Sequence, residues 1–234
     1  MNDLIRLEKV TKEYRDNGVP VMALGGVDLS IAQGEFTVIM GPSGSGKSTI
    51  LNIMGGLDQP TSGLVEVAGR DTSVLSNTQL SRLRLYKIGF VFQAYNLVPV
   101  LTAYENAEYV LMLHGMPAHE RRDRIMNLLK TVGLEGLENR FPRELSGGQQ
   151  QRVAIARAIA PEPELVLADE PTANVDSKTS GSLLELMMQL NADKGVTFLF
   201  STHDPAVMQR ARRIIRLKDG LIDADQQNSR GTAL

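Results

Sequence analysis

The stretch Gly41-Pro42-Ser43-Gly44-Ser45-Gly46-Lys47-Ser48-Thr49 decides the fold class of this chain. It has the form G-x-x-x-x-G-K-[ST], which is the phosphate-binding loop of nucleotide-hydrolysing proteins. Residues 36–40 before it are apolar and rich in strand-forming side chains, as a buried parallel strand should be. Residues 48–54 after it can continue as a helix until Gly55 and Gly56 end it. The order of strand, loop and helix predicts an α/β fold of the P-loop kind.

The residue types of this loop suit it to holding nucleotide phosphates. Its glycines let backbone N–H groups turn toward an anion, and the helix that starts near Gly46 points its positive end at the same anion. Lys47 supplies a charge for the β- and γ-phosphates, and the Ser48 hydroxyl is placed to hold Mg²⁺. A glycine-rich turn that binds nothing is the alternative, which the strand and helix on either side disfavour. The expected phosphate-binding residues are Gly41, Ser43, Gly44, Ser45, Gly46, Lys47, Ser48 and Thr49.

Composition narrows the function classes. The 234 residues, 42% of them apolar, are enough for one large or two small domains with a core. The net charge of −2 lacks the basic footprint of a dedicated nucleic-acid binder, and the absence of cysteine excludes disulfides, thiol catalysis and cysteine-based metal sites. No apolar run approaches the ~18 residues that span a bilayer, and the charged first residues do not form a signal peptide. We therefore expect a soluble, cytoplasmic protein whose contact with a membrane comes through a partner chain.

Strand patterns dominate the first third of the chain. Residues 4–10 and 27–31 alternate apolar and polar side chains, and residues 64–69 form another short strand. Between the first two lie Tyr14 and a turn-rich piece at residues 16–20. We expect a small N-terminal antiparallel β subdomain joined to a core of mostly parallel strands.

The pattern turns helical in the middle of the chain and returns to strands afterwards. Thr102 and Glu105 have the spacing of a capping box before a helix, and residues 121–130 are amphipathic. Asp176 is an expected N-cap for a helix over residues 177–190, and Asp219-Gly220 predicts a hairpin. The expected division is an α/β core with the β subdomain at residues 1–93 and 161–222, an inserted helical subdomain at residues 94–160 and a polar, frayed tail at residues 223–234.

Two acidic residues follow an apolar strand at residues 165–168. A strand that ends in an acid places a carboxylate at the carboxyl edge of the sheet, where ligands bind in open α/β folds. Asp169 is expected to orient Mg²⁺, and Glu170 to polarise a water in line with the γ-phosphate. The alternative is that Asp169 and Glu170 only cap the next element. The presence of the P-loop in the same chain disfavours this alternative.

The motif Leu145-Ser146-Gly147-Gly148-Gln149 adds a second anion site. Ser146 can cap the helix that follows, Gln149 can complete a capping box, and the two glycines leave the first N–H groups unshielded. One triphosphate does not need two such cradles from one direction. Either the chain folds the second cradle over its own nucleotide, or a second copy supplies it.

With these motifs in this order, the chain resembles the ATP-binding subunit of ABC transporters over nearly its whole length. The resemblance identifies residues 41–49 as Walker A, Gln93 as the Q-loop glutamine, residues 145–149 as the family signature, residues 166–169 with Glu170 as Walker B and the catalytic base, Asp176 as the D-loop aspartate, His203 as the switch histidine and Tyr14 as the aromatic residue that stacks on adenine. It implies that two copies sandwich two ATP molecules head to tail, each signature closing on the nucleotide of the other copy.

The resemblance also implies the roles of the site residues. The catalytic set is Glu170, His203, Gln93 and Lys47, the Mg²⁺ set is Ser48, Gln93 and Asp169, and Tyr14, Ser146, Gly147, Gly148, Gln149 and Asp176 join the P-loop in binding ATP. Plainer interpretations stand beside these: Tyr14 as a partly buried strand residue, Gln93 as a solvated loop residue, and His203 as a neighbour of a helix cap. Residues 121–124, Arg-Arg-Asp-Arg, are expected to be a solvated helix face, with a permease contact as the lesser alternative.

Residues 92–97 and the run Gln149-Gln150-Gln151 before Arg152 are similar to the lipoprotein-releasing and macrolide-efflux branch of the family. Permeases of that branch have few transmembrane helices and a large extracytoplasmic domain. Residues 173–175, Ala-Asn-Val, depart from the usual Gly-Ala-Leu of the branch, although Asp176 is retained.

We therefore predict an ATPase that powers a separate membrane permease as a homodimer. The resemblance places it on the cytoplasmic face of the inner membrane, with ATP and Mg²⁺ as cofactors and with no nucleic acid partner. The alternative from another class is a soluble ABC ATPase that acts on ribosomes or DNA. A single cassette without a long coiled-coil insert favours the transporter.

Overall fold

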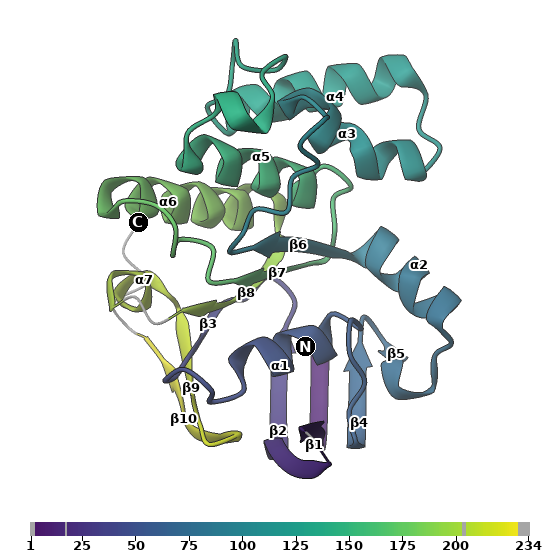
Figure 1. The fold of residues 1–234 in the computed structure, drawn as a ribbon, viewed down its shortest axis with the longest axis vertical. Coiled ribbons are helices and arrows are strands. Elements are labelled where there is room, and N and C mark those ends of the chain that lie inside the picture. The colour runs from purple at the N-terminus through teal and green to yellow at the C-terminus, as the bar shows by residue number, and fades with distance from the viewer. Residues whose placement is uncertain (1–2, 17, 203–204, 229–234) are drawn as a thin grey trace.

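Two β-sheets meet around helix α1 (Lys47–Met54) in the computed structural model of the chain, which describes residues 3–16, 18–202 and 205–228 (Figure 1). The larger sheet has the strand order β10-β9-β3-β8-β7-β6. Its parallel strands are β3 (Phe36–Met40), β6 (Ile88–Phe92), β7 (Leu165–Asp169), β8 (Thr197–Thr202) and β9 (Arg213–Lys218), and β10 (Leu221–Gln227) pairs with β9 antiparallel at the edge.

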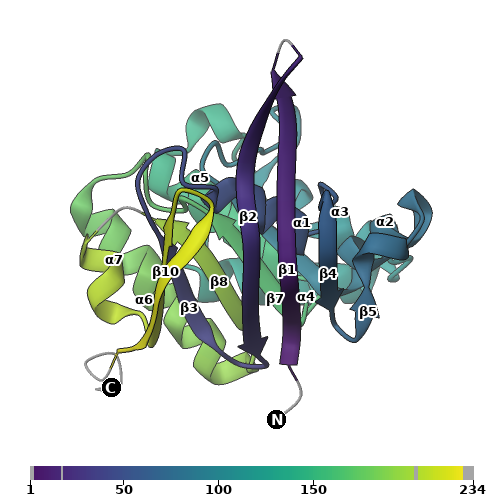
Figure 2. The ribbon, with the colours of Figure 1, turned by 90° about the horizontal axis from the view of Figure 1, so that it is seen from below.

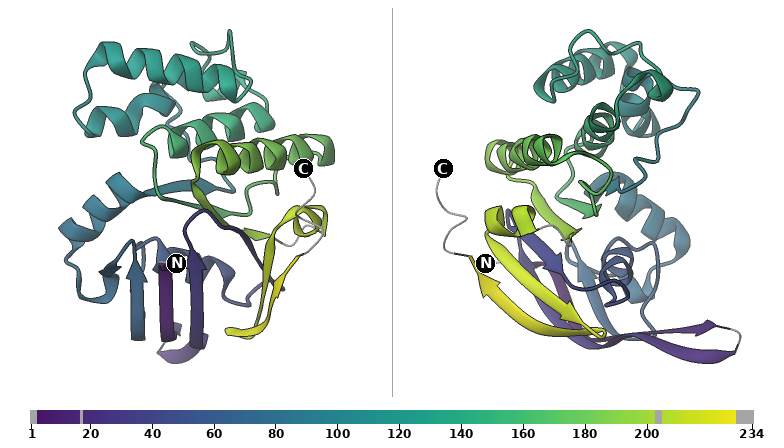
Figure 3. Two further views of the ribbon diagram at one scale, coloured as in Figure 1. Left: turned by 180° about the vertical axis from the view of Figure 1, so that it is seen from behind. Right: turned by 60° about the vertical axis from the view of Figure 1, so that its left-hand side comes forward.

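The smaller sheet is antiparallel and has the strand order β2-β1-β4-β5. Its strands are β1 (Asp3–Asp16), β2 (Val19–Ala32), β4 (Ser62–Val67) and β5 (Arg70–Asp71). The view onto this sheet shows α1 behind β1 and β2 (Figure 2), and the β1–β2 hairpin extends beyond the rest of the molecule (Figure 3). This confirms the predicted antiparallel β subdomain, with β1 and β2 longer than the sequence pattern indicated.

Alternate side chains of the central strands face opposite layers. Val38 and Phe198 lie in a buried cluster with apolar residues of the helices, whereas Ile39 and Leu199 lie in a second cluster with α1 and the smaller sheet. This follows from the two-residue period of a strand, because both faces of a central parallel sheet must be covered. The P-loop helix is therefore clamped between two sheets.

Helices cover the other face of the larger sheet. Helices α5 (Gly147–Ile159) and α6 (Ser177–Lys194) lie against this face, and α3 (Ala103–Leu113) and α4 (Ala118–Thr131) pack on α5 farther from the sheet (Figure 1). Helix α2 (Asn77–Lys87) precedes β6, and α7 (Pro205–Arg210) follows β8. Short 3-10 helices are η1 (Thr72–Val74) and η2 (Pro142–Glu144). In the described part of the chain, no helix combines the length and the apolar character needed to cross a bilayer.

The predicted caps are present in the structure. Thr102 and Glu105 form a capping box on α3, and Asp176 accepts hydrogen bonds from the N–H groups of Lys178 and Thr179 at the start of α6. Helix α2 was not anticipated, although Ser76 and Gln79 also form a capping box.

The expectation of a frayed tail from residue 223 is wrong over its first five residues. Asp219 and Gly220 form the predicted hairpin, with φ values of 48° and 74°, and β10 then continues to Gln227. The Arg213 guanidinium holds this strand by donating to the Asp225 carboxylate at 2.8 and 2.6 Å. Residues 229–234 lie outside the described part.

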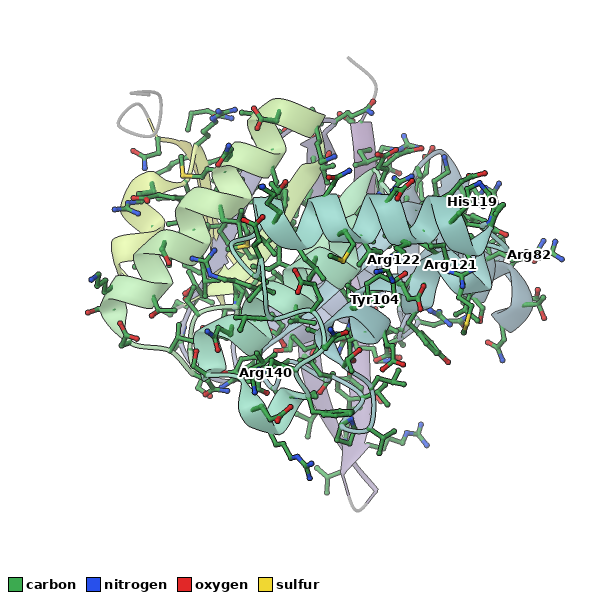
Figure 4. All side chains as sticks on the ribbon, turned by 90° about the horizontal axis from the view of Figure 1, so that it is seen from above. Arg82, Tyr104, His119, Arg121, Arg122 and Arg140 are labelled. Carbon is green, nitrogen blue, oxygen red and sulfur yellow. The ribbon has the colours of Figure 1, made fainter. Side chains whose placement is uncertain are left out.

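The basic run at residues 121–124 is only partly a solvated face. Arg122 is exposed, but Arg121 donates to the Glu108 carboxylate at 2.9 Å and to the Met116 carbonyl at 2.5 Å, and Arg124 pairs with Glu162. Figure 4 labels Arg121 and Arg122 on α4 near Tyr104 of α3. Arg121 therefore ties α4 to α3 instead of facing solvent freely.

Candidate active site

The P-loop forms the floor of an open pocket of about 580 Å³. The residues that line it come from the P-loop, from β2 and from the loops after β6 and β7. They are Ala23, Gly41, Pro42, Ser43, Gly44, Gly46, Lys47, Ser48, Thr49, Gln93 and Glu170. The structure thus brings together all of the predicted phosphate-binding residues except Ser45 with Gln93 and Glu170, which lie 46 and 123 positions after Lys47 in the sequence.

Glycine is required at two positions of the loop. Gly46, the N-cap of α1, has a φ of 101°, which side chains rarely adopt. A Cβ on Gly41 would lie 2.2 Å from the Leu217 carbonyl oxygen. The loop is also braced by the β9–β10 turn, because the Gly220 N–H donates to the Ser45 carbonyl at 3.1 Å.

Lys47 and Ser48 stand at the start of α1, where backbone N–H groups are unsatisfied. The Lys47 ammonium donates to the carbonyls of Gly41 at 2.8 Å and Pro42 at 2.9 Å, so it is held over the loop. The first turn of α1 carries no acidic side chain. This end of the pocket is therefore positive, as phosphate binding requires. The Ser45 side chain, in contrast, is 2% exposed and does not line the pocket.

The predicted carboxylates lie at the carboxyl end of the sheet. Asp169 pairs in register with Phe92 of β6 and Ser201 of β8, and its carboxylate accepts a hydrogen bond from the Ser201 hydroxyl at 2.5 Å. The Glu170 N–H donates to the carbonyl of Ser201 at 3.2 Å and to its hydroxyl at 3.1 Å. Glu170 has a φ of 47°, so the chain turns sharply there and leaves its side chain in the pocket wall.

Tyr14, on β1, is not one of the described residues that line the pocket. Its hydroxyl donates to the Asp58 carboxylate at 2.7 Å, and the Lys12 ammonium lies 4.8 Å from the centre of its ring. Lys12 also donates to Asp58 at 2.6 Å. Burial raises the pKa of the Tyr14 hydroxyl, and the bond to Asp58 acts in the same direction. Lys12 and Asp58 fix the ring, and the sequence pattern did not single them out.

The Asp58→Asn variant is expected to lower the stability at pH 7 by about 1 kcal/mol, because it weakens charge-assisted hydrogen bonds. Burial alone would raise the pKa of Asp58, but the bonds from Lys12 and Tyr14 outweigh it and hold this pKa below its ordinary value. The stabilisation is therefore present above the unfolded-state pKa and is lost as the pH falls through the folded-state pKa. Thermal unfolding of both proteins from pH 7 to pH 3 should show converging Tm values. A difference in Tm that stays constant with pH would contradict this. The control is Asp123→Asn, at an exposed side chain on α4.

The second anion site is a well-formed helix N-terminus away from this pocket. Ser146 caps α5, and Gln149 completes the capping box through bonds of 3.3 and 2.9 Å, as predicted. None of residues 145–149 is among the described residues that line the P-loop pocket. Of the two alternatives, a chain that folds this cradle over its own nucleotide is therefore disfavoured.

Asp176 stands apart from the pocket lining. Asp176 is exposed, and its carboxylate accepts from the Thr179 hydroxyl at 2.7 Å, which lowers the pKa of Asp176. His203 lies outside the described residues.

The residues present fit a magnesium ion bound mainly through phosphate. Ser48, Gln93 and Asp169 offer hydroxyl, amide and carboxylate oxygens, which are the ligand types that Mg²⁺ prefers. The described residues contain no group of three or more His, Cys, Asp or Glu side chains gathered to hold a metal. A site with few protein ligands is typical of an ion that arrives with a nucleotide.

Comparisons with known proteins agree with this geometry. The sequence profile of the ABC transporter family matches residues 24–173. The chain is 47% identical over 230 residues to the lipoprotein-releasing system ATP-binding protein LolD of Anaeromyxobacter dehalogenans, covering 98% of this chain and 96% of that one. It is 47% identical over 226 residues to the macrolide export ATP-binding/permease protein MacB of Syntrophobacter fumaroxidans, covering 95% of this chain and 32% of that one.

A solved structure is similar over the whole fold. The dimeric post-hydrolysis state of the ATP-binding cassette MJ0796 from Methanocaldococcus jannaschii, bound to ADP and phosphate, superposes with a TM-score of 0.89 at 47% identity. The match covers 95% of this chain and 98% of that one.

Proposed function

Because the chain belongs to the ABC transporter family as an ATP-binding and ATP-hydrolysing subunit, we propose that two copies of it power a separate membrane permease. The observation that carries the proposal is the pair of helix N-termini: α1 in the P-loop pocket and α5 outside it. An anion-binding end that does not face its own pocket is suited to the nucleotide of a second copy. The dimeric arrangement of MJ0796 supports this choice.

The pocket residues divide the work of hydrolysis. The P-loop N–H groups and Lys47 hold the phosphates, and Glu170 in the pocket wall orients the attacking water. Gln93 and His203 position that water and respond to the γ-phosphate. Mg²⁺, when bound through Ser48, Gln93 and Asp169, would neutralise charge on the phosphates. Catalysis by this site is mainly positioning and charge stabilisation, which a preorganised loop provides.

The permease is proposed to dock in a second groove, of about 380 Å³, on the helical side of the molecule. It is mostly apolar and is lined by residues of α2, β6, α3, the end of α5 and the loops after β6 and α5, together with Leu57: Ser81, Arg84, Leu85, Ile88, Gly89, Phe90, Phe92, Asn96, Val110, Arg157, Ala158 and Pro161. Phe92 is the neighbour of Gln93, so a segment seated here would contact the pocket wall from behind. ATP-driven closure would then reach the permease through residues 94–160, the helical subdomain.

The transported class is proposed from the relatives. LolD is named for lipoprotein release and MacB for macrolide export, so we place this chain with ATPases that drive release or efflux. Such a subunit would sit on the cytoplasmic face of the membrane, held by its permease.

Purification of the chain from native membranes in mild detergent tests the proposal. The expected result is a stoichiometric permease with a large extracytoplasmic domain. Leu57→Asp, in the groove, should reduce its recovery about tenfold or more, because a buried unpaired charge opposes docking. Val74→Asp, at a side chain 76% exposed and outside the groove, is the matched control. Recovery with ribosomes or DNA and no membrane protein would contradict the proposal.

A further inference from the structure

Helix α5 holds the loops on either side of the catalytic pocket. The Arg157 guanidinium, near its C-terminal end, donates to the carbonyls of Asn96 at 2.6 Å and Tyr95 at 2.9 Å. The Gln151 side-chain amide, nearer its N-terminus, donates to the Pro171 carbonyl at 2.6 Å. Tyr95 lies two residues after Gln93, and Pro171 directly follows Glu170. One helix therefore donates hydrogen bonds to the main chain near both Gln93 and Glu170.

The bond from Gln151 is deeply buried. The Gln151 side chain is 0% exposed, and its Oε1 has no hydrogen-bond partner among the residues that the structure describes. Burying an amide with an unpaired oxygen lowers stability, which an apolar side chain of similar length would avoid. Compared with such an apolar side chain, Gln151 adds one contact, which is its hydrogen bond to the Pro171 carbonyl.

Asn174 joins the two loops directly. Its side-chain amide donates to the main-chain carbonyl of Gln93 at 2.9 Å. The main-chain carbonyl of Asn174 accepts a hydrogen bond from the Tyr95 hydroxyl at 3.2 Å. A Cβ on Gly147, the first residue of α5, would lie 2.8 Å from the same Tyr95 hydroxyl. The start of α5 therefore packs closely against Tyr95. Alanine, glycine or leucine at position 174 could not donate to Gln93.

The backbone at these hydrogen bonds has an unusual conformation. Tyr95, Asn96 and Glu170 have φ values of 59°, 49° and 47°. Side-chain-bearing residues keep such a conformation when the surrounding structure imposes it. Arg157 donates to the carbonyls of Tyr95 and Asn96 themselves. Gln151 donates to the carbonyl of Pro171, one residue after Glu170. The contacts of α5 thus coincide with the strained positions of the pocket wall.

We propose that Gln151 and Asn174 are positioning residues that make α5, the Gln93 loop and the Glu170 loop move as one unit. The inference rests on the proposed function, in which the N-terminus of α5 contacts the nucleotide of a second copy. Closing of α5 on that nucleotide then sets the position of Glu170 in the chain's own pocket. Hydrolysis in one site depends on occupancy of the other because the same helix belongs to both.

The test compares Gln151→Met and Asn174→Ala with the wild-type chain in steady-state ATP hydrolysis. Both variants should lower kcat, by about fivefold or more for Gln151→Met and about threefold for Asn174→Ala, while KM and ATP affinity stay within about twofold. The Hill coefficient for ATP should fall toward unity, which loss of stability alone would not cause. Gln150→Met is the matched control, since Gln150 donates to the carbonyl of Leu145, just before its own helix, and to neither pocket loop.

Unchanged kcat and Hill coefficient in a folded Gln151→Met protein would overturn the proposal, as would an equal change in Gln150→Met. Should Gln151→Met fail to fold, Asn174→Ala and Tyr95→Phe decide, because Asn174 is exposed and the Tyr95 change removes one hydroxyl. Wild-type values in both would then overturn it. A wild-type chain without ATP hydrolysis would instead contradict the proposed function.

Discussion

Glu170→Gln is expected to bind ATP like the wild-type chain, to hydrolyse it at least about 100-fold more slowly and to accumulate as an ATP-bound dimer. Glutamine has the shape of glutamate but cannot accept a proton from water. Glu170 lies in the pocket wall, and two hydrogen bonds from its N–H to Ser201 hold its backbone. The substitution should therefore leave the loop in place and remove the chemistry.

Phosphate release at saturating ATP measures the loss of rate, and size-exclusion chromatography with and without ATP measures the dimer. Glu185→Gln is the control, since Glu185 is an exposed carboxylate on α6 that pairs with Arg210. A Glu170→Gln protein with full activity would mean that another group orients the water. Loss of ATP binding together with activity would instead point to damage to the P-loop.

The pocket could be predicted because of how parallel strands are arranged. The carboxyl ends of β3, β6 and β7 meet at one edge of the sheet, so motifs that follow these strands converge whatever their separation in sequence. For this reason the motifs alone predict that Lys47, Gln93 and Glu170 share one pocket, and all three line it.

The side chains that support this wall could not be predicted in the same way. Ser201 lies in a fully buried strand, where a serine in the sequence looks like any small core residue. Asp58 is 44 positions from the Tyr14 hydroxyl that it accepts from, and no local period connects the two. Gln151 belongs to a run of three glutamines, and its burial alone distinguishes it from its neighbours.

Helix α2 and the last strand were missed for a different reason. Leu80 and Leu83 are the buried residues of α2, so its apolar period is too weak to recognise, and the capping box at Ser76 was the remaining signal. The polar sequence of β10 suggested disorder, but a strand at the sheet edge needs few apolar residues when an ion pair such as that of Arg213 with Asp225 holds it.

Lys47→Ala is expected to weaken ATP binding by about 10- to 100-fold, because a hydrogen bond from a charged donor contributes about 1.5–3 kcal/mol. Without ATP, the fold should be little affected. The Lys47 ammonium donates to the carbonyls of Gly41 and Pro42, which line an open pocket and can be hydrated instead. The change should therefore appear in binding and not in the stability of the ATP-free chain.

Thermal unfolding with and without ATP separates these two effects. At an ATP concentration about 100 times the wild-type Kd, binding should stabilise the wild-type chain by about 2.7 kcal/mol, whereas a variant with a 100-fold weaker Kd should gain about 0.4 kcal/mol. Lys130→Ala, at an exposed lysine in the last turn of α4 that pairs with Glu135, should respond like wild type. An equal ATP-induced rise in Tm for Lys47→Ala and wild type would show that the loop N–H groups and the dipole of α1 hold the phosphates without the lysine.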